Sequence, residues 1–173
     1  MYNRYETAST GEPEFPELAE ILKHFSSPFQ HRPACNGPVS WKDWPAAQAD
    51  INLAKAALQG AKAEDIFMTS PSPGQIARYL KNSYYKTDEE FIFALADALR
   101  EEYLAIVDAG FILQIDDPGL VDWWDMLKPA LSVEEYRDRF ARLRIDAINH
   151  ALKGIPEDRV RYHLCWGSWH GPH

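Results

Sequence analysis

The chain has 173 residues, of which 46% are hydrophobic and 13% aromatic, and it carries a formal net charge of −8. This composition is typical of a packed globular protein and excludes a disordered chain, while the negative charge and the lack of a basic run argue against a nucleic-acid-binding protein. No apolar run approaches the roughly 20 residues of a transmembrane helix, and neither a signal peptide nor a disulfide framework is indicated, so we expect a soluble cytoplasmic protein with reduced thiols.

The chain is predicted to begin with a polar lead-in over residues 1–29, in which residues 17–25 place apolar side chains at helical spacing. Residues 30–173 are expected to form one domain in which strands and helices alternate. Strands are predicted at 34–41, 66–68, 111–115 and 160–166. Helices are predicted at 45–59, 75–82, 87–110 and 132–154.

Two of these helices have clear start and stop signals. Thr87 and Glu90 form a predicted capping box, as do Ser132 and Glu135, because a hydroxyl and a glutamate three residues later can each bond the other's backbone N–H. Glycine follows both helices, which is the residue that most often ends a helix in the left-handed conformation.

Regular alternation of strands and helices indicates parallel strands joined by helical crossovers. An open doubly wound sheet and part of a (β/α)8 barrel both fit this pattern. Each predicted strand ends in a polar loop, as expected over a barrel mouth, and no Gly-x-Gly-x-x-Gly fingerprint follows the first strand. Four strands are too few for a whole barrel. We therefore predict an α/β fold consisting of a partial TIM (β/α)8 barrel, with about four central β/α units (strands 3–6).

The last predicted strand carries a candidate metal site. His163 and Cys165 are two residues apart, so a strand would point both side chains to the same face. An imidazole and a thiolate are half of a tetrahedral zinc site. From spacing alone, a buried histidine and a buried thiol in the core are the commoner explanation for this pair. The polar and aromatic loop that follows, residues 167–173, favours a functional site.

The motifs along the chain resemble those of one known family. They are Gly37-Pro38-Val39-Ser40, Thr69-Ser70-Pro71, the run from Leu113 to Pro118, the run from Arg144 to Asn149, and His163-Leu164-Cys165. In this order and at these strand ends, they resemble the catalytic barrel of cobalamin-independent methionine synthase and its shorter single-barrel relatives. The resemblance covers about residues 30–173.

The resemblance implies roles for particular residues. His163 and Cys165 match the first two zinc ligands, and the family's glutamate and second cysteine ligands would lie beyond His173. Asp116 matches the aspartate that holds the ammonium group of the amino acid, and Ser40 lies in a motif of the substrate pocket. Asp117 stands where the family has glutamate, which leaves its role open. His170 is a candidate acid for the leaving folate nitrogen, with a solvated loop histidine as the alternative.

The activity implied by the resemblance is zinc-dependent methyl transfer from methyltetrahydrofolate to the thiol of homocysteine, which makes methionine without cobalamin. Bound zinc turns a thiol of pKa near 8.5 into a thiolate, and a carboxylate at the barrel mouth can position the amino acid. Two alternatives stay open. One is a zinc-dependent transferase for another thiol, of the epoxide–coenzyme M type, and the other is a partial barrel without catalysis of its own.

Overall fold

The structure is a computed structural model, and it describes residues 16–17, 33–122, 124 and 131–165. The described part is an α/β fold with parallel strands, as predicted from the alternation of elements. The strands are β1 (Ala34–Cys35), β2 (Phe67–Pro71), β3 (Lys81–Asn82), β4 (Ile112–Asp116) and β5 (Val160–His163). The helices are α2 (Trp44–Ala57), α3 (Pro73–Tyr79), α4 (Asp88–Asp108), α5 (Gly119–Asp122), α6 (Val133–Tyr136), the π-helical η2 (Arg137–Ala141), α7 (Arg142–Leu152) and the 3-10 helix η3 (Glu157–Arg159).

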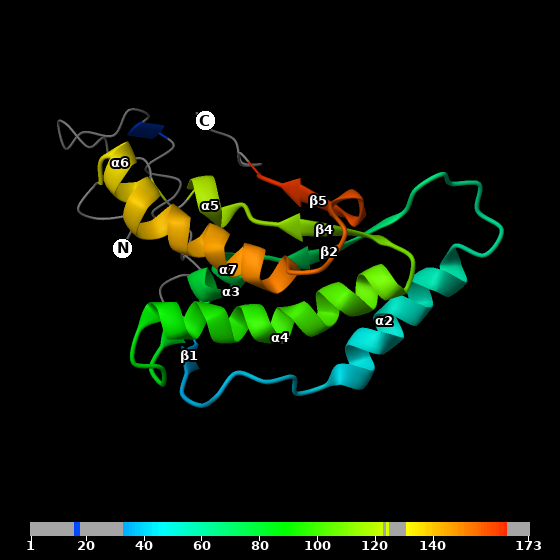
Figure 1. Ribbon diagram of the computed structural model, residues 1–173, viewed down its shortest axis with the longest axis horizontal. Coiled ribbons are helices and arrows are strands. Elements are labelled where there is room, and N and C mark those ends of the chain that lie inside the picture. The colour runs from blue at the N-terminus through cyan, green and yellow to red at the C-terminus, as the bar shows by residue number, and fades with distance from the viewer. Residues whose placement is uncertain (1–15, 18–32, 123, 125–130, 166–173) are drawn as a thin grey trace.

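A parallel sheet of three strands, in the order β2-β4-β5, forms the centre of the fold. Figure 1 shows the three arrows pointing in the same direction. The register places Asp116 beside Pro71 on one side and beside His163 on the other. The carboxyl ends of all three strands therefore lie together at one edge of the sheet.

Two long helices, α4 and α7, pack against each other and lie along one side of this sheet (Figure 1). Strand β4 turns Leu113 and Ile115 toward them, and both side chains are fully buried, while the alternate residues of the strand are only partly buried. Alternation of this kind identifies the buried face of a strand. The core cluster joins α2, α4, β4 and α7 and consists of Ile51, Ile92, Ala96, Leu99, Tyr103, Ile106, Phe111, Leu113, Ile115, Ala147 and Ala151.

The long helix α4 begins and ends close to its predicted caps. The Thr87 hydroxyl accepts a hydrogen bond from the backbone N–H of Glu90 (3.0 Å), whereas the Glu90 carboxylate accepts from the N–H of Lys86 rather than from that of the cap residue. Gly110, at φ 94°, follows the helix in a conformation that other residues avoid. The second predicted capping box, between Ser132 and Glu135, is confirmed in both directions.

The prediction of four strands in one sheet is wrong for the described residues. The strand predicted at 34–41 is only two residues long and pairs with β3, in a separate small sheet. Its extension is blocked because Pro38 has no N–H to donate and the N–H of Val39 bonds the Tyr85 hydroxyl (2.8 Å) instead of a neighbouring strand. Strand β3 itself was predicted as the end of a helix, which stops earlier because Leu80 is extended.

Two further boundaries differ from the prediction. The helix expected over 132–154 is interrupted by the π-helical turn η2, where Phe140 stacks on Tyr136. The strand expected over 160–166 ends at His163, because its neighbour β4 ends at Asp116 and Pro118 then turns the chain away. The helix expected over 17–25 extends into residues outside the described ranges. In the part of the chain that the structure describes, no helix is both long and apolar enough to cross a membrane.

The packing of β4 against the helices predicts a large loss of stability from Leu113→Ala. Leu113 is fully buried, so its truncation leaves a cavity and should lower the free energy of unfolding by about 2–5 kcal/mol. Leu53→Ala is the control, because Leu53 is 69% exposed on α2. This variant should change the free energy of unfolding by less than about 0.5 kcal/mol. Urea unfolding followed by circular dichroism measures both variants, and equal losses would contradict this assignment of the core.

Candidate functional site

The carboxyl ends of β4 and β5 bring together two residues that the sequence singled out. The Nδ1 atom of His163 lies 2.7 Å from the Oδ1 atom of Asp116, at hydrogen-bond distance. The two residues are direct partners in the parallel register, so the strands themselves hold the pair in place. Both side chains remain substantially exposed, at 48% for His163 and 38% for Asp116, which leaves them accessible to a ligand.

A row of polar side chains extends from this pair along one face of the sheet, toward the amino ends of the strands. The Nε2 atom of Gln114 donates to Asp116 Oδ1 (3.0 Å), and Gln114 Oε1 in turn accepts from the Nε atom of Arg161 (2.6 Å). The Arg161 guanidinium lies over the ring of Phe67, 3.5 Å from its centroid. Three strands thus contribute to one connected row.

Sequence reasoning missed Gln114, Arg161 and Phe67. A signal for the first two was present, because residues two positions apart on a strand share a face. Gln114 precedes Asp116 by two residues, and Arg161 precedes His163 by two. Phe67 carried no such signal, since its place beside Arg161 depends on how β2 pairs. The row borders a shallow pocket of about 500 Å³, whose lining residues are Phe67, Gln114, Arg161, Tyr162, His163 and Leu164.

Below the exposed pair lies a buried carboxyl group, Asp117. Its side chain is fully buried, and its Oδ2 atom accepts a hydrogen bond from the Tyr162 hydroxyl (2.6 Å). Its backbone N–H donates to the carbonyl of His163 (3.0 Å), which continues the ladder between the strands. Within the described residues, the Oδ1 atom of Asp117 has no hydrogen-bond partner.

Burial raises the pKa of Asp117, and the hydrogen bond from Tyr162 and the charge of Arg144 oppose this rise without cancelling it. Burial also raises the pKa of Tyr162, and its bond to Asp117 adds to that rise. A low-dielectric environment disfavours the charged form of both groups. The Asp117 side chain thus serves as a buried acceptor for Tyr162.

The other predicted site residues lie in different surroundings. Cys165 is half-buried two residues beyond the end of β5, so it no longer belongs to the strand whose alternation predicted its direction. His170 and the second loop histidine, His173, lie outside the described residues. Among the residues that the structure describes, no group of three or more histidine, cysteine, aspartate or glutamate side chains is placed to hold a metal ion.

Ser40 is exposed and lines a second pocket, of about 370 Å³, between residues 39–43 and the helices α3 and α4. Trp41 fixes this segment by donating from its indole Nε1 to the carbonyl of Ala98 in α4 (2.8 Å). Pro71, at the end of β2, lines the same pocket and is the register partner of Asp116. Ser40 is therefore near the carboxyl end of β2, but it does not line the pocket of His163.

Comparison with known proteins gives matches to curated methionine synthases. The protein of Sulfolobus acidocaldarius is 26% identical over 142 residues, which cover 82% of this chain and 36% of that protein. The protein of Saccharolobus solfataricus is 24% identical over 149 residues, with 86% and 39% covered. A protein of Saccharolobus islandicus is 30% identical over 107 residues, with 61% and 28% covered. Over most of its length, this chain is similar to part of these methionine synthases. The resemblance inferred from its motifs is confirmed.

The fold has a counterpart among solved structures. A B12-independent methionine synthase from Shewanella sp. W3-18-1, solved in complex with selenomethionine, superimposes with a TM-score of 0.56 and 22% identity. The match covers 78% of this chain and 34% of the other. No protein-family model matches the sequence. The methionine synthase-like chain thus spans between about a quarter and two fifths of the length of these relatives.

The buried Asp117 predicts a specific dependence of stability on pH. Its pKa is raised in the folded state, so the folded chain binds the proton more tightly than the unfolded chain does. Its contribution to stability should therefore fall as the pH rises from the ordinary aspartate pKa of about 3.9 through the raised value. Asp117→Asn still accepts from Tyr162 but does not titrate, so its free energy of unfolding should fall less over this range. Urea unfolding between about pH 4 and about pH 8 compares the slopes, and equal slopes would refute the assignment.

Proposed function

We propose that this chain is part of a zinc-dependent methyltransferase that moves a methyl group from methyltetrahydrofolate to the thiol of homocysteine, without cobalamin. Its similarity to methionine synthases supports the reaction class. The observation that carries the proposal is the pairing of Asp116 with His163 at the carboxyl ends of neighbouring parallel strands. These are two residues to which the motif resemblance assigns the substrate ammonium group and the metal.

The side chains of His163 and Cys165 provide nitrogen and sulfur donor atoms, which are the types that zinc prefers. When its Nδ1 atom carries the proton and bonds Asp116, the Nε2 atom is left with the lone pair that a metal requires. A carboxylate behind a ligating histidine is the usual arrangement at zinc sites, because it fixes the orientation of the ring. Cys165 would supply the thiolate ligand. Since no third ligand stands nearby in the described ranges, the remaining ligands are proposed to come from other parts of the protein.

Zinc, when bound, would hold the acceptor thiol as a thiolate at neutral pH. The residues of the chain would position the amino acid that carries the thiol. Both hydrogen-bond contacts of the Asp116 side chain, with His163 and Gln114, involve Oδ1, which leaves Oδ2 to accept from the ammonium group. Holding the ammonium group and the sulfur at fixed points converts the transfer into a reaction between positioned groups. Ser40, which lines the neighbouring pocket near the end of β2, is proposed to contact the substrate from that side, and His170 is proposed as the acid for the leaving folate nitrogen.

We infer that β2, β4 and β5 are neighbouring strands of a (β/α)8 barrel formed by residues 30–173 together with further strands. The parallel order, the helices along one side and the ligand-like residues at the carboxyl ends support this fold. In the described part, β2 and β5 each have one edge without a partner strand, and unpaired edges favour association. The same observation favours a second candidate, in which this chain has no catalysis until a partner completes the barrel.

Zinc binding tests the metal assignment. We expect Cys165→Ser to weaken zinc binding by at least about tenfold, because a hydroxyl is a far poorer zinc ligand than a thiolate. Cys35 bonds the carbonyl of Gly37 (3.3 Å), a contact that serine preserves, so Cys35→Ser should bind zinc as the parent chain does. Competition with a chromophoric chelator measures the dissociation constants, and native mass spectrometry gives the subunit and zinc counts. Equal affinity of both variants would exclude Cys165 as a ligand.

The positioning role of Asp116 predicts a loss that is specific to the amino acid. Asp116→Asn removes the charge that attracts the ammonium group, which should lower kcat/KM for homocysteine by about 10–100-fold. Asp108→Asn, an exposed change at the end of α4, serves as the control and should leave it unaltered. The assay measures methyl transfer from methyltetrahydrofolate. It uses this chain together with the segments that complete the proposed barrel, if the chain alone is inactive. An unchanged KM for homocysteine in Asp116→Asn would contradict the role.

A further inference from the structure

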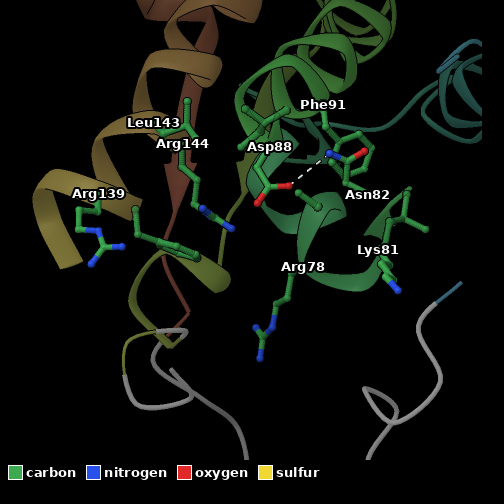
Figure 2. A pocket seen from close by; sticks show the side chains of 12 residues that line it. Arg78, Lys81, Asn82, Asp88, Phe91, Arg139, Leu143 and Arg144 are labelled. Carbon is green, nitrogen blue, oxygen red and sulfur yellow. Dashed lines mark hydrogen bonds between the residues drawn. The ribbon is translucent and has the colours of Figure 1, made fainter. Parts of the chain in front are cut away.

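A third cavity, of about 400 Å³, lies between α3, β3, the start of α4 and the η2–α7 segment (Figure 2). Its charged lining residues come from five elements, which belong to two separate stretches of the sequence, residues 78–88 and 139–144. The cations are Arg78, Lys81, Arg139 and Arg144, and the acid is Asp88. The lining therefore carries an excess of positive charge in a chain whose net charge is −8.

The central cation of this cavity is Arg144. It is only 9% exposed, and its guanidinium stacks on the ring of Phe140, 3.2 Å from the centroid. Burial lowers the pKa of Arg144 to about 10, so the group still carries its charge at neutral pH. Within the described part of the chain, Arg144 has neither a salt bridge nor a hydrogen bond to a carboxylate. Buried charges are normally paired, because leaving water is costly.

Two features of the backbone hold this side chain in the cavity. Gly74 lies directly against it, and a Cβ atom at that position would come within 2.9 Å of the Arg144 Cγ atom. The π-helical turn η2 contributes Arg139 and Phe140 to the lining. Single π-helical turns are found preferentially at functional sites, since they are otherwise unfavourable. The absence of a side chain at Gly74 thus leaves room for the buried Arg144, and the π-helical turn places the exposed Arg139 in the same lining.

The acid in the lining does not neutralise this charge. The carboxylate of Asp88 accepts a hydrogen bond from the Asn82 side chain (3.3 Å) and interacts with Arg144 through space. Figure 2 shows Asp88 and Arg144 extending from α4 and α7 into the same cavity. By formal count the lining holds four cations and one carboxylate, and Arg144 also interacts through space with Asp117, which lies outside the lining.

We propose that this cavity binds a compact anion that carries two or more negative charges, such as a phosphate monoester or a small polycarboxylate. Guanidinium groups bond the oxygens of both chemistries in a bidentate manner. A ligand that enters from solvent would supply a directly bonded counter-ion, which Arg144 does not have among the described residues. The inference rests on the cavity and its charges and does not depend on methyl transfer at the strand ends.

Isothermal titration calorimetry on the 173-residue chain tests this site with inorganic phosphate and with citrate as probes, at constant ionic strength. We expect one of them to bind with a stoichiometry of one, and the stronger probe identifies the chemistry. Arg139→Gln alters an exposed side chain and should fold normally, yet it should weaken binding by about tenfold through the loss of a charge-assisted bond. Arg144→Gln should weaken it at least as much.

Arg142→Gln is the matched control, because Arg142 is an exposed residue of the same segment that pairs with Asp138 and does not line the cavity. Its affinity should equal that of the parent chain. Equal weakening in Arg142→Gln and Arg139→Gln would mean attraction by net charge alone and would overturn the proposal. Absence of saturable binding by both probes would also overturn it. A Tm of Arg139→Gln close to that of the parent chain shows that the comparison concerns folded protein.

Discussion

The register of the central strand β4 is the constraint on which the rest of the structure depends. It pairs with β2 on one side and β5 on the other, so a shift of one residue would turn Leu113 and Ile115 away from the helices and bury polar residues in their place. The same register sets Asp116 beside His163. The core residues and the candidate site residues thus lie on opposite faces of β4. Burial of Leu113 and Ile115 fixes the register, and the register fixes the position of Asp116 beside His163.

The site combines an exposed layer with a buried one. Asp116 and His163 are accessible, whereas Asp117 is fully buried and accepts a hydrogen bond from the Tyr162 hydroxyl. Tyr162 itself is 41% exposed, so this bond links the buried carboxyl group to the surface of the pocket. The bond between Asp117 and Tyr162 joins the loop after β4 to the end of β5. It therefore helps to fix the orientation of the neighbouring His163, which a metal ligand requires.

The distribution of charge has a consequence for partners. An acidic chain repels anions at long range, but a cavity that gathers arginines from α3, η2 and α7 attracts them locally. Arg144 also contributes to the electrostatics around Asp117, so the cavity and the strand ends are connected through one side chain. Occupation of the cavity by an anion would change the field at Asp117 and hence the environment of Tyr162.

Several features of this protein were determined by its sequence alone. The caps at Thr87 and Ser132, the glycine stops and the apolar runs act over a few residues, so local physics decides the helices and the strands β2, β4 and β5. The order of short motifs was also sufficient to identify the methionine synthase resemblance and to select Asp116 and His163. The length of β1 and its pairing with β3 were not predictable, because they depend on where the Tyr85 hydroxyl meets the Val39 N–H. The row through Gln114 and Arg161 and the cluster around Arg144 were decided only by tertiary structure, since their members come from elements that meet through packing and register rather than through proximity in the chain.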